Sequence, residues 1–421
     1  MSSTSADVTI IGGGLVACFA AYFLRRRGRS VVVIEKGKAC AAASGSNFGN
    51  LRLQGRHRAE FPLSLRAQAI WEDLARLSGE DCGLLPCGHV YLGCAASDQP
   101  KLEQVAGEAH SAGLAVELLS GAAARRRWPM LSALITGASW SNRDAIAEPN
   151  RAAPAVARLA VRAGAELVEQ TKVSAIARTA SGFVVETDRG HSFGCGLILN
   201  AAGAWAGEIA EQCGEPVPMF AAGPPLFQVR PQHAWDGPSL HAIDGSVLLR
   251  PGHDGEAVAG SFPRVKADLA TGRAEVPPDR VQRGLARLLD VAPGLGSFAI
   301  GRVWSGVEGY LPDMLPVLGW SRTTPGFMHA FGFSGHGFQL APGVGAVVAD
   351  LIAEGRTETG IEAFSIARFA GGVMPDARLW QEFDPDLVSR FRPGNAKAGG
   401  EDRHSDLAGS PAAALPDAGN S

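Results

Sequence analysis

Residues 7–35, DVTIIGGGLVACFAAYFLRRRGRSVVVIE, carry the pattern that decides the fold of this chain. An apolar run over residues 8–11 leads into three glycines, and a segment with helical spacing of apolar residues follows. A second apolar run over residues 31–34 ends at Glu35. This order predicts a strand, a tight turn, a helix and a second strand, the opening unit of a doubly wound α/β sheet.

The glycines stand where a bound pyrophosphate would need them. Gly12 permits the turn, and Gly14 lets backbone N–H groups approach phosphates at the positive end of the helix. Glu35 follows Gly14 by 21 residues and would accept hydrogen bonds from ribose hydroxyls. The stretch therefore predicts dinucleotide binding. It does not distinguish FAD from NAD, because both use this turn. A glycine turn in an ordinary α/β unit is the alternative.

Composition narrows the class of protein. The chain has 421 residues, of which 46% are hydrophobic, enough for two or three packed domains. Its net charge of −3 does not indicate a protein that binds nucleic acid. Seven cysteines without a CxxC pair indicate neither a disulfide framework nor a metal site. With neither a signal peptide nor a membrane-length apolar run, we expect a cytoplasmic protein without an integral membrane segment.

Later stretches extend the pattern. Residues 196–210, GLILNAAGAWAGEIA, repeat the order of buried strand, glycine turn and helix. Residues 216–298 favour strands separated by Pro and Gly turns, which predicts an antiparallel sheet. Residues 393–421 are rich in Gly, Ala, Pro and Asp and predict a disordered tail.

Four further stretches complete a family pattern: SGSNFGN (44–50), ILNAAGAWA (198–206), WSGVEGYLPDMLPVLG (304–319) and GFSGHGFQLAPGVG (332–345). Together with residues 7–35 they resemble the D-amino-acid oxidase-like (DAO) superfamily of flavoproteins, in its monomeric sarcosine oxidase and glycine oxidase branch. The resemblance implies an α/β (α+β overall) fold, with a Rossmann-like FAD-binding domain of glutathione-reductase type and an antiparallel-sheet substrate domain. We expect residues 1–80, 145–215 and 300–375 in the first domain, and 81–144 and 216–299 in the second.

The resemblance also implies FAD as the cofactor. Relatives that bind it covalently place a cysteine in the segment matching residues 304–313, and this chain has none there, so we expect non-covalent FAD. Gly12, Gly14 and Glu35 would take the ADP portion, and the loop from Gly335 would lie against the flavin. The implied FAD-binding residues are Gly12, Gly14, Leu15, Val16, Glu35, Lys36, Ser44, Asn47, Gly49, Val173, Ala201, Gly203, Trp205, Gly335, His336, Gly337, Phe338 and Gln339.

Two positions depart from the family pattern. Glu308 stands where glycine oxidase carries an arginine for the substrate carboxylate, and Gln339 stands where monomeric sarcosine oxidase carries a lysine. Two hypotheses follow. Either the substrate is an amine whose cationic group pairs with Glu308, or a carboxylate is held elsewhere, at Arg52 or Arg56.

The implied reaction is oxidation of a C–N bond in an amine or amino acid, with hydride transfer to the flavin and hydrolysis of the imine. His336 could accept the amine proton, while Gln339 and Tyr310 would shape the pocket. The resemblance implies that oxidases of this branch use a lysine near the flavin to promote reaction with O2. Lys266 is the only lysine between Lys172 and Lys397. A dehydrogenase using a quinone or electron carrier is therefore favoured over an oxidase using O2. A subunit of a heteromeric sarcosine- or opine-oxidising complex and a flavin monooxygenase are the alternatives.

Overall fold

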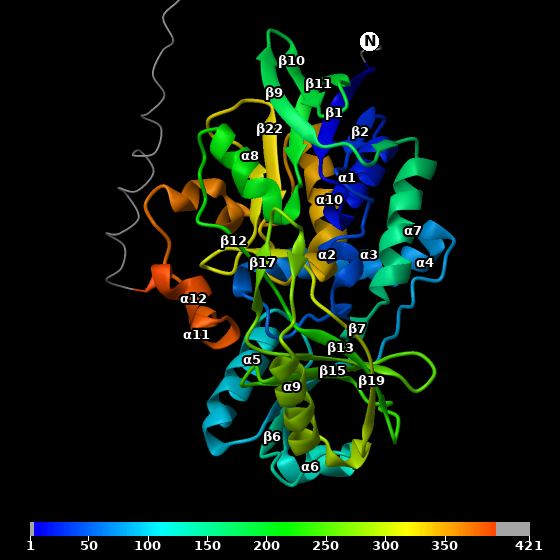
Figure 1. Ribbon diagram of the computed structural model, residues 1–421, viewed down its shortest axis with the longest axis vertical. Helices are drawn as coiled ribbons and strands as arrows, with labels where there is room; N and C mark the ends of the chain where they lie inside the picture. The colour runs from blue at the N-terminus through cyan, green and yellow to red at the C-terminus, as the bar shows by residue number, and fades with distance from the viewer. Residues whose placement is uncertain (1–3, 393–421) are drawn as a thin grey trace, which may run out of the picture.

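The computed structural model describes residues 4–392 and contains two large sheets and two smaller ones (Figure 1). The first sheet has the order β21-β22-β11-β1-β2-β8, and the β9–β10 hairpin extends from β11. From β22 to β8 neighbouring strands are parallel, whereas β21 is antiparallel to β22. Its strands are β1 (Thr4–Ile11), β2 (Val31–Ile34), β8 (Glu166–Val168), β9 (Val173–Thr179), β10 (Gly182–Thr187), β11 (Ser192–Asn200), β21 (Val317–Trp320) and β22 (Phe327–Phe331).

The two faces of this sheet bury alternate residues of the same strands. Val8, Ile10 and Val33 pack with the helices on one face. Val32 and Ile34 pack on the other face, against the β9–β10 hairpin. A central strand covered on both sides must be apolar throughout, which explains the uninterrupted runs at residues 8–11 and 31–34.

Helices α1 and α10 lie against each other on one face of the first sheet (Figure 1). A Cβ on Gly345 of α10 would lie 2.6 Å from the Cβ of Phe19, so the two helices approach as closely as glycine allows. Helix α7 packs on α1, and α3 packs on α10. The helices are α1 (Leu15–Arg26), α2 (Ala43–Ser46), α3 (Phe61–Glu72), α4 (Leu74–Ser78), α5 (Gln99–Ser111), α6 (Gly121–Arg127), α7 (Pro149–Arg162), α8 (Ala206–Gln212), α9 (Pro278–Val291), α10 (Gly337–Glu354), α11 (Leu379–Glu382) and α12 (Pro385–Val388).

The second large sheet has the order β19-β13-β16-β15-β14-β4-β6-β5 and is antiparallel except where β14 meets β4. Its strands are β4 (His89–Gly93), β5 (Glu117–Ser120), β6 (Gly137–Ser141), β13 (Leu226–Pro231), β14 (Ser239–Ala242), β15 (Val247–Pro251), β16 (Ala257–Ser261) and β19 (Phe298–Trp304). Val90, Leu240 and Leu249 pack on the side of α9. Their neighbours Tyr91, His241 and Leu248 border a cavity instead. The two-residue period of the strands thus makes one face a core and the other a site wall.

The remaining short strands form two smaller sheets. A four-stranded sheet has the order β18-β17-β12-β20, and β3 pairs with β7. Their bounds are β3 (Asn50–Leu51), β7 (Ala145–Ile146), β12 (Phe220–Gly223), β17 (Val265–Asp268), β18 (Arg273–Ala274) and β20 (Glu308–Tyr310).

The α/β fold with a parallel first sheet and a largely antiparallel second sheet is confirmed. The domain boundaries stay a prediction, and the expected tail, residues 393–421, lies outside the described residues. Within residues 4–392, no helix combines the length and the apolar character needed to cross a membrane.

Candidate functional site

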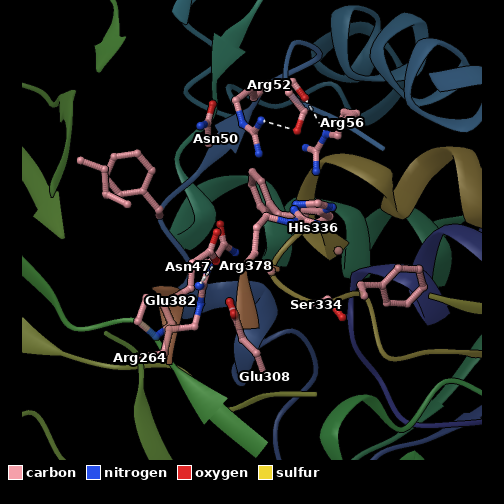
Figure 2. A pocket seen from close by; sticks show the side chains of 18 of the residues that line it. Asn47, Asn50, Arg52, Arg56, Arg264, Glu308, Ser334, His336, Arg378 and Glu382 are labelled. Atoms are coloured by element: carbon pink, nitrogen blue, oxygen red, sulfur yellow. Dashed lines mark hydrogen bonds and ion pairs between the residues drawn. The ribbon is translucent and has the colours of Figure 1, made fainter. Parts of the chain in front are cut away.

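A cavity of about 600 Å³ lies where the first sheet, the second sheet and the C-terminal segment meet (Figure 2). The starts of α1 and α10 both border it, so the positive ends of two helix dipoles meet one space. Tyr91 and His241 of the second sheet form another part of its wall. Such a site suits a long ligand with negative charge at one end and a polar group at the other.

The turn between β1 and α1 forms a backbone cradle. Gly12 has φ +97°, and a Cβ there would lie 2.5 Å from the carbonyl oxygen of Ala201, so only glycine fits. Gly14 caps α1 without a side-chain hydrogen bond, and the Leu15 N–H donates to Ser44 Oγ at 2.9 Å. At this edge of the cavity the chain therefore presents backbone groups rather than side chains.

Glu35 is fixed beside this cradle. One carboxylate oxygen accepts the Gly13 N–H at 2.6 Å, and the other accepts the Gly37 N–H at 2.7 Å. Lys36 places its Nζ 3.0 Å from the ring centre of Trp205, whose indole N–H donates to the Leu269 carbonyl at 2.9 Å. The acid at the end of β2 is thus oriented before any ligand arrives.

His336 is the N-cap residue of α10 and is bound to a buried acid. Its Nδ1 lies 3.0 and 3.1 Å from the two carboxylate oxygens of Glu60, which is fully buried. Burial lowers the pKa of His336 to about 4, despite the opposing effect of Glu60. Burial alone would raise the pKa of Glu60, but His336, Arg56 and Arg378 lower it to about 2. At neutral pH the imidazole is therefore neutral, donates its Nδ1–H to Glu60 and keeps Nε2 as an acceptor.

Glu308 borders the cavity from β20 as part of a second polar cluster. The Tyr310 hydroxyl donates to Glu308, and Arg264 forms an ion pair with Glu382. Burial raises the pKa of Glu308, opposed by the Tyr310 hydrogen bond and the charge of Arg264. Burial also raises the pKa of Tyr310 well above its usual range. Figure 2 shows this cluster on the far side of His336 from Arg52 and Arg56.

Arg52 and Arg56 form the cationic part of the wall. Arg52 donates through Nη1 to the carbonyls of Gln54 and Gly55 and to the Tyr91 hydroxyl. Arg56 is 3% exposed and donates through Nε to the Arg52 carbonyl, while its buried Nη1 has no partner. Burial and the charge of Arg52 lower the pKa of Arg56 to about 10, so it stays charged at neutral pH. Among the described residues, neither guanidinium forms an ion pair with a carboxylate.

Most of the residues expected from the sequence come together at this cavity. Those that border it are Gly14, Leu15, Val16, Ser44, Asn47, Gly49, Arg52, Arg56, Ala201, Gly203, Glu308, Gly335, His336, Gly337 and Phe338. Those that do not are Gly12, Glu35, Lys36, Val173, Trp205, Tyr310 and Gln339. The Gln339 side chain turns away and donates to the Ser64 carbonyl of α3 at 2.9 Å, so its position does not support a role in shaping the pocket.

The charged residues of the site that were missed by reading the sequence include Glu60, Arg264, Arg378 and Glu382. Glu60 lies 276 residues from His336, and Arg264 lies 118 residues from Glu382. The one available signal was Glu60 itself, an acid placed directly before the apolar start of α3.

Comparison with known proteins places this geometry in a family. The model of the DAO family, described as FAD dependent oxidoreductase, matches residues 7–351. The chain belongs to the DAO family. It is 27% identical over 375 residues to the glycine oxidase of Geobacillus kaustophilus, covering 87% of this chain and 98% of that one. It is also 25% identical to the mitochondrial sarcosine dehydrogenase of Mus musculus, covering 90% of this chain and 43% of that protein.

Solved structures of the family agree with the fold. The crystal structure of the Geobacillus kaustophilus glycine oxidase has a TM-score of 0.80 at 26% identity, covering 86% of this chain and 99% of that one. The L-proline dehydrogenase of P. horikoshii also has a TM-score of 0.80, at 25% identity, covering 88% of this chain and 100% of that one. This DAO-family chain is therefore an FAD-dependent oxidoreductase acting on CH–NH or CH–NH2 bonds.

The residues present fit FAD, the cofactor of the family. A dinucleotide needs a phosphate site that backbone can reach closely, and the Gly12 turn leaves no room even for a Cβ. It also needs an acid for the ribose, and Glu35 is held in place by two backbone N–H groups. At the other end, α10 begins at the cavity with no side chain capping its first turn.

Proposed function

We propose that this flavoenzyme oxidises the C–N bond of an amino acid, with the substrate carboxylate held by Arg52 and Arg56. The observation that carries the proposal is the pair of buried guanidinium groups without a carboxylate partner among the described residues. Burying a charge is unfavourable unless it is paired. The buried acids Glu60 and Asp144 influence these two cations without forming an ion pair with them, so a ligand carboxylate would find unpaired donors here. A substrate carboxylate supplies it with bidentate geometry.

The same cavity offers a place for the substrate nitrogen. Glu308 lies across from the two arginines, with His336 between the two clusters (Figure 2). A zwitterion would direct its carboxylate to Arg52 and Arg56 and its nitrogen toward Glu308, which joins the two hypotheses raised by the sequence. The buried Glu308 favours an amine there and disfavours a second anion at short range.

His336 would accept a hydrogen bond from the neutral form of the bound amine. Its neutral ring presents Nε2 as an acceptor while Glu60 holds Nδ1, and a pKa lowered to about 4 makes the ring too weak a base to take the proton of an ammonium. FAD, when bound, accepts the hydride from the carbon that carries the nitrogen. The role of the chain is to hold that carbon in place and to supply an amine with a free lone pair.

We further propose that FAD is bound non-covalently and that reduced enzyme passes electrons to an acceptor other than O2. No cysteine borders the cavity among residues 4–392, which supports the non-covalent state. Lys266 is exposed on β17, and Lys101 is the lysine of the described chain that borders the cavity. Neither position offers a buried cation that could promote reaction with oxygen.

The test is anaerobic bleaching of the holoenzyme with N-methyl amino acids and with the matching amines that lack the carboxylate. We expect bleaching only by the carboxylated compounds. Arg52→Gln and Arg56→Gln should each raise the substrate Kd by tenfold or more, because each removes a charge-assisted pair. Arg76→Gln, which removes an exposed arginine paired with Asp73, is the control and should leave the Kd unchanged. Equal bleaching by amines without a carboxylate would contradict the proposal.

A further inference from the structure

The two arginines of the carboxylate site lie on one short loop, and a buried acid from another part of the chain holds that loop. The loop follows β3, which pairs with β7. Asp144 lies directly before β7 and is fully buried, and its Oδ1 accepts the Leu53 N–H at 2.9 Å. The carboxylate is therefore attached to the stretch of backbone that separates Arg52 from Arg56.

A second side chain fixes the same stretch to the second sheet. The Gln54 amide donates to the His89 carbonyl at 2.8 Å, and its oxygen accepts the Ser139 hydroxyl at 2.9 Å. Both anchors hold backbone that lies between the two arginines. The points from which the Arg52 and Arg56 side chains extend toward the cavity are therefore set from outside the loop.

Asp144 itself is incompletely paired. Among the described residues its Oδ2 is buried without a hydrogen-bond partner, and so is the hydroxyl oxygen of Ser141. Burial raises the pKa of Asp144 to about 6, against the lowering effects of the Leu53 N–H and of the Arg52 charge. The acid therefore changes between its neutral and its charged form close to neutral pH.

The charge of Asp144 acts on the two arginines that would hold a carboxylate. Burial lowers the pKa of Arg56, and Asp144 is among the acids that oppose this effect. A ligand carboxylate at the arginines would have the same sign of charge as ionised Asp144, so each disfavours the other in a buried site. A ligand carboxylate should therefore bind more tightly when Asp144 is protonated.

We propose that Asp144 is a positioning residue of the carboxylate site, which orients the arginine loop through Leu53 and weakens carboxylate binding when it is ionised. The inference rests on the proposed function, because the carboxylate is the one held by Arg52 and Arg56. Asp144 does not border the cavity, so it acts through the loop and through its charge rather than by contact with the ligand. The affinity for a carboxylate should be highest below about pH 6 and fall as the pH rises through this value.

Most other titrating groups around the loop lie outside the range from pH 6 to pH 8. Burial or pairing shifts the pKa of six of them out of that range: His89, His241, Cys87, Glu60, His336 and Arg56. Two further groups border the cavity. His57 is exposed beside Arg56, and Glu308 lies on the far side, where burial raises its pKa.

Binding of propionate to the holoenzyme, followed by flavin absorbance from pH 6 to pH 8, tests the inference. Propionate stays almost fully ionised in this range, and propionamide is the uncharged control compound. We expect the propionate Kd of the wild type to rise about threefold or more, whereas the propionamide Kd should not rise. Asp144→Asn, which can still accept the Leu53 N–H, should bind propionate more tightly at pH 8 and lose most of the rise. Asp144→Ala, which also removes this hydrogen bond, should bind propionate more weakly than Asp144→Asn at every pH.

Matched variants assign the rise to Asp144. His57→Asn keeps an acceptor for the Ala59 N–H and should retain the wild-type rise. Glu308 is present in both the wild type and Asp144→Asn, so its contribution cancels in that comparison. A wild type without a rise, or Asp144→Asn with the full rise, would overturn the inference.

Proton uptake gives a measurement that does not need the Asp144 variants. Calorimetry at pH 7 in two buffers of different ionisation enthalpy should show that propionate binding takes up protons, and the double variant His57→Asn/Glu308→Gln should keep this uptake. If Asp144→Asn fails to retain FAD, loss of the uptake in the double variant overturns the inference. Propionate binding that is unchanged in Arg52→Gln would instead refute the proposed function.

Discussion

Replacing His336 by Asn should change how the stability of this enzyme depends on pH. In the wild-type enzyme His336 is buried against Glu60 and its pKa is lowered to about 4 from the ordinary 6.5. In the unfolded chain His336 therefore takes up a proton near pH 6.5, whereas in the folded chain it takes up that proton only near pH 4. Stability falls as the pH falls through this window, and the contribution is complete only above pH 6.5.

The magnitude follows from the width of the window. One pKa unit corresponds to about 1.4 kcal/mol, so between pH 6.5 and pH 5 His336 alone should cost the wild type roughly 2 kcal/mol of unfolding free energy. Glu60, with a pKa lowered from 4.5 to about 2, adds its own loss only below about pH 4.5. In the wild type, a comparison of pH 7 with pH 5 therefore reports on the histidine. In the variant, loss of His336 also raises the pKa of Glu60, which reduces the stability loss on acidification further in the same direction.

Urea unfolding of the FAD-loaded enzyme at the two pH values measures the effect. Other buried histidines with lowered pKa values, His89, His241 and His329, contribute equally to both proteins and cancel in the difference. We expect His336→Asn to lose about 2 kcal/mol less than the wild type, and a substitution at the exposed His233 to behave like the wild type. Parallel losses in wild type and His336→Asn would refute a neutral imidazole bound to a carboxylate.

Three further outcomes follow from the same geometry. Gly12→Ala should abolish FAD retention, because its Cβ meets the Ala201 backbone, whereas Gly28→Ala, with open space, should keep the yellow cofactor. Gly345→Ala should destabilise the enzyme by about 1–3 kcal/mol through the clash with α1, while Gly107→Ala, open and helical, should stabilise it by roughly 0.5–1 kcal/mol in thermal unfolding. Lys266→Met should leave reoxidation in air unchanged within about twofold, and a tenfold loss in stopped-flow traces would restore a role for this lysine.

Sequence reading succeeded where the signal is contiguous. The β1–α1–β2 unit was predicted because its apolar periods and its glycines follow each other within 29 residues. His336, Glu308 and Arg52 were found because they lie in or beside motifs. Gln339 lies in a motif too, but its side chain donates to the Ser64 carbonyl of α3, because α3 packs along α10 and covers this part of the helix.

The acids that complete the site could not be found in this way. Glu60 meets His336 only because α3 packs along α10, and Glu382 meets Arg264 only because the chain returns after α10. These contacts depend on the packing of distant elements, and no local period of the sequence encodes them. The sequence therefore predicted Glu308 as an anion of the pocket without the acids and arginines that surround it.

The contrast has a physical origin in what each ligand demands of the chain. A dinucleotide is recognised largely by backbone, which needs glycines and a strand–turn–helix path, and both leave a compact record in the sequence. A small zwitterion is recognised by side-chain charges that converge from separate parts of the chain, here the segments before α3, β17 and α11, together with β20. Substrate preference can change at any one of these elements without disturbing the cradle. The C-terminal segment is the clearest case, because Arg378 and Glu382 reach the cavity from residues beyond the family match.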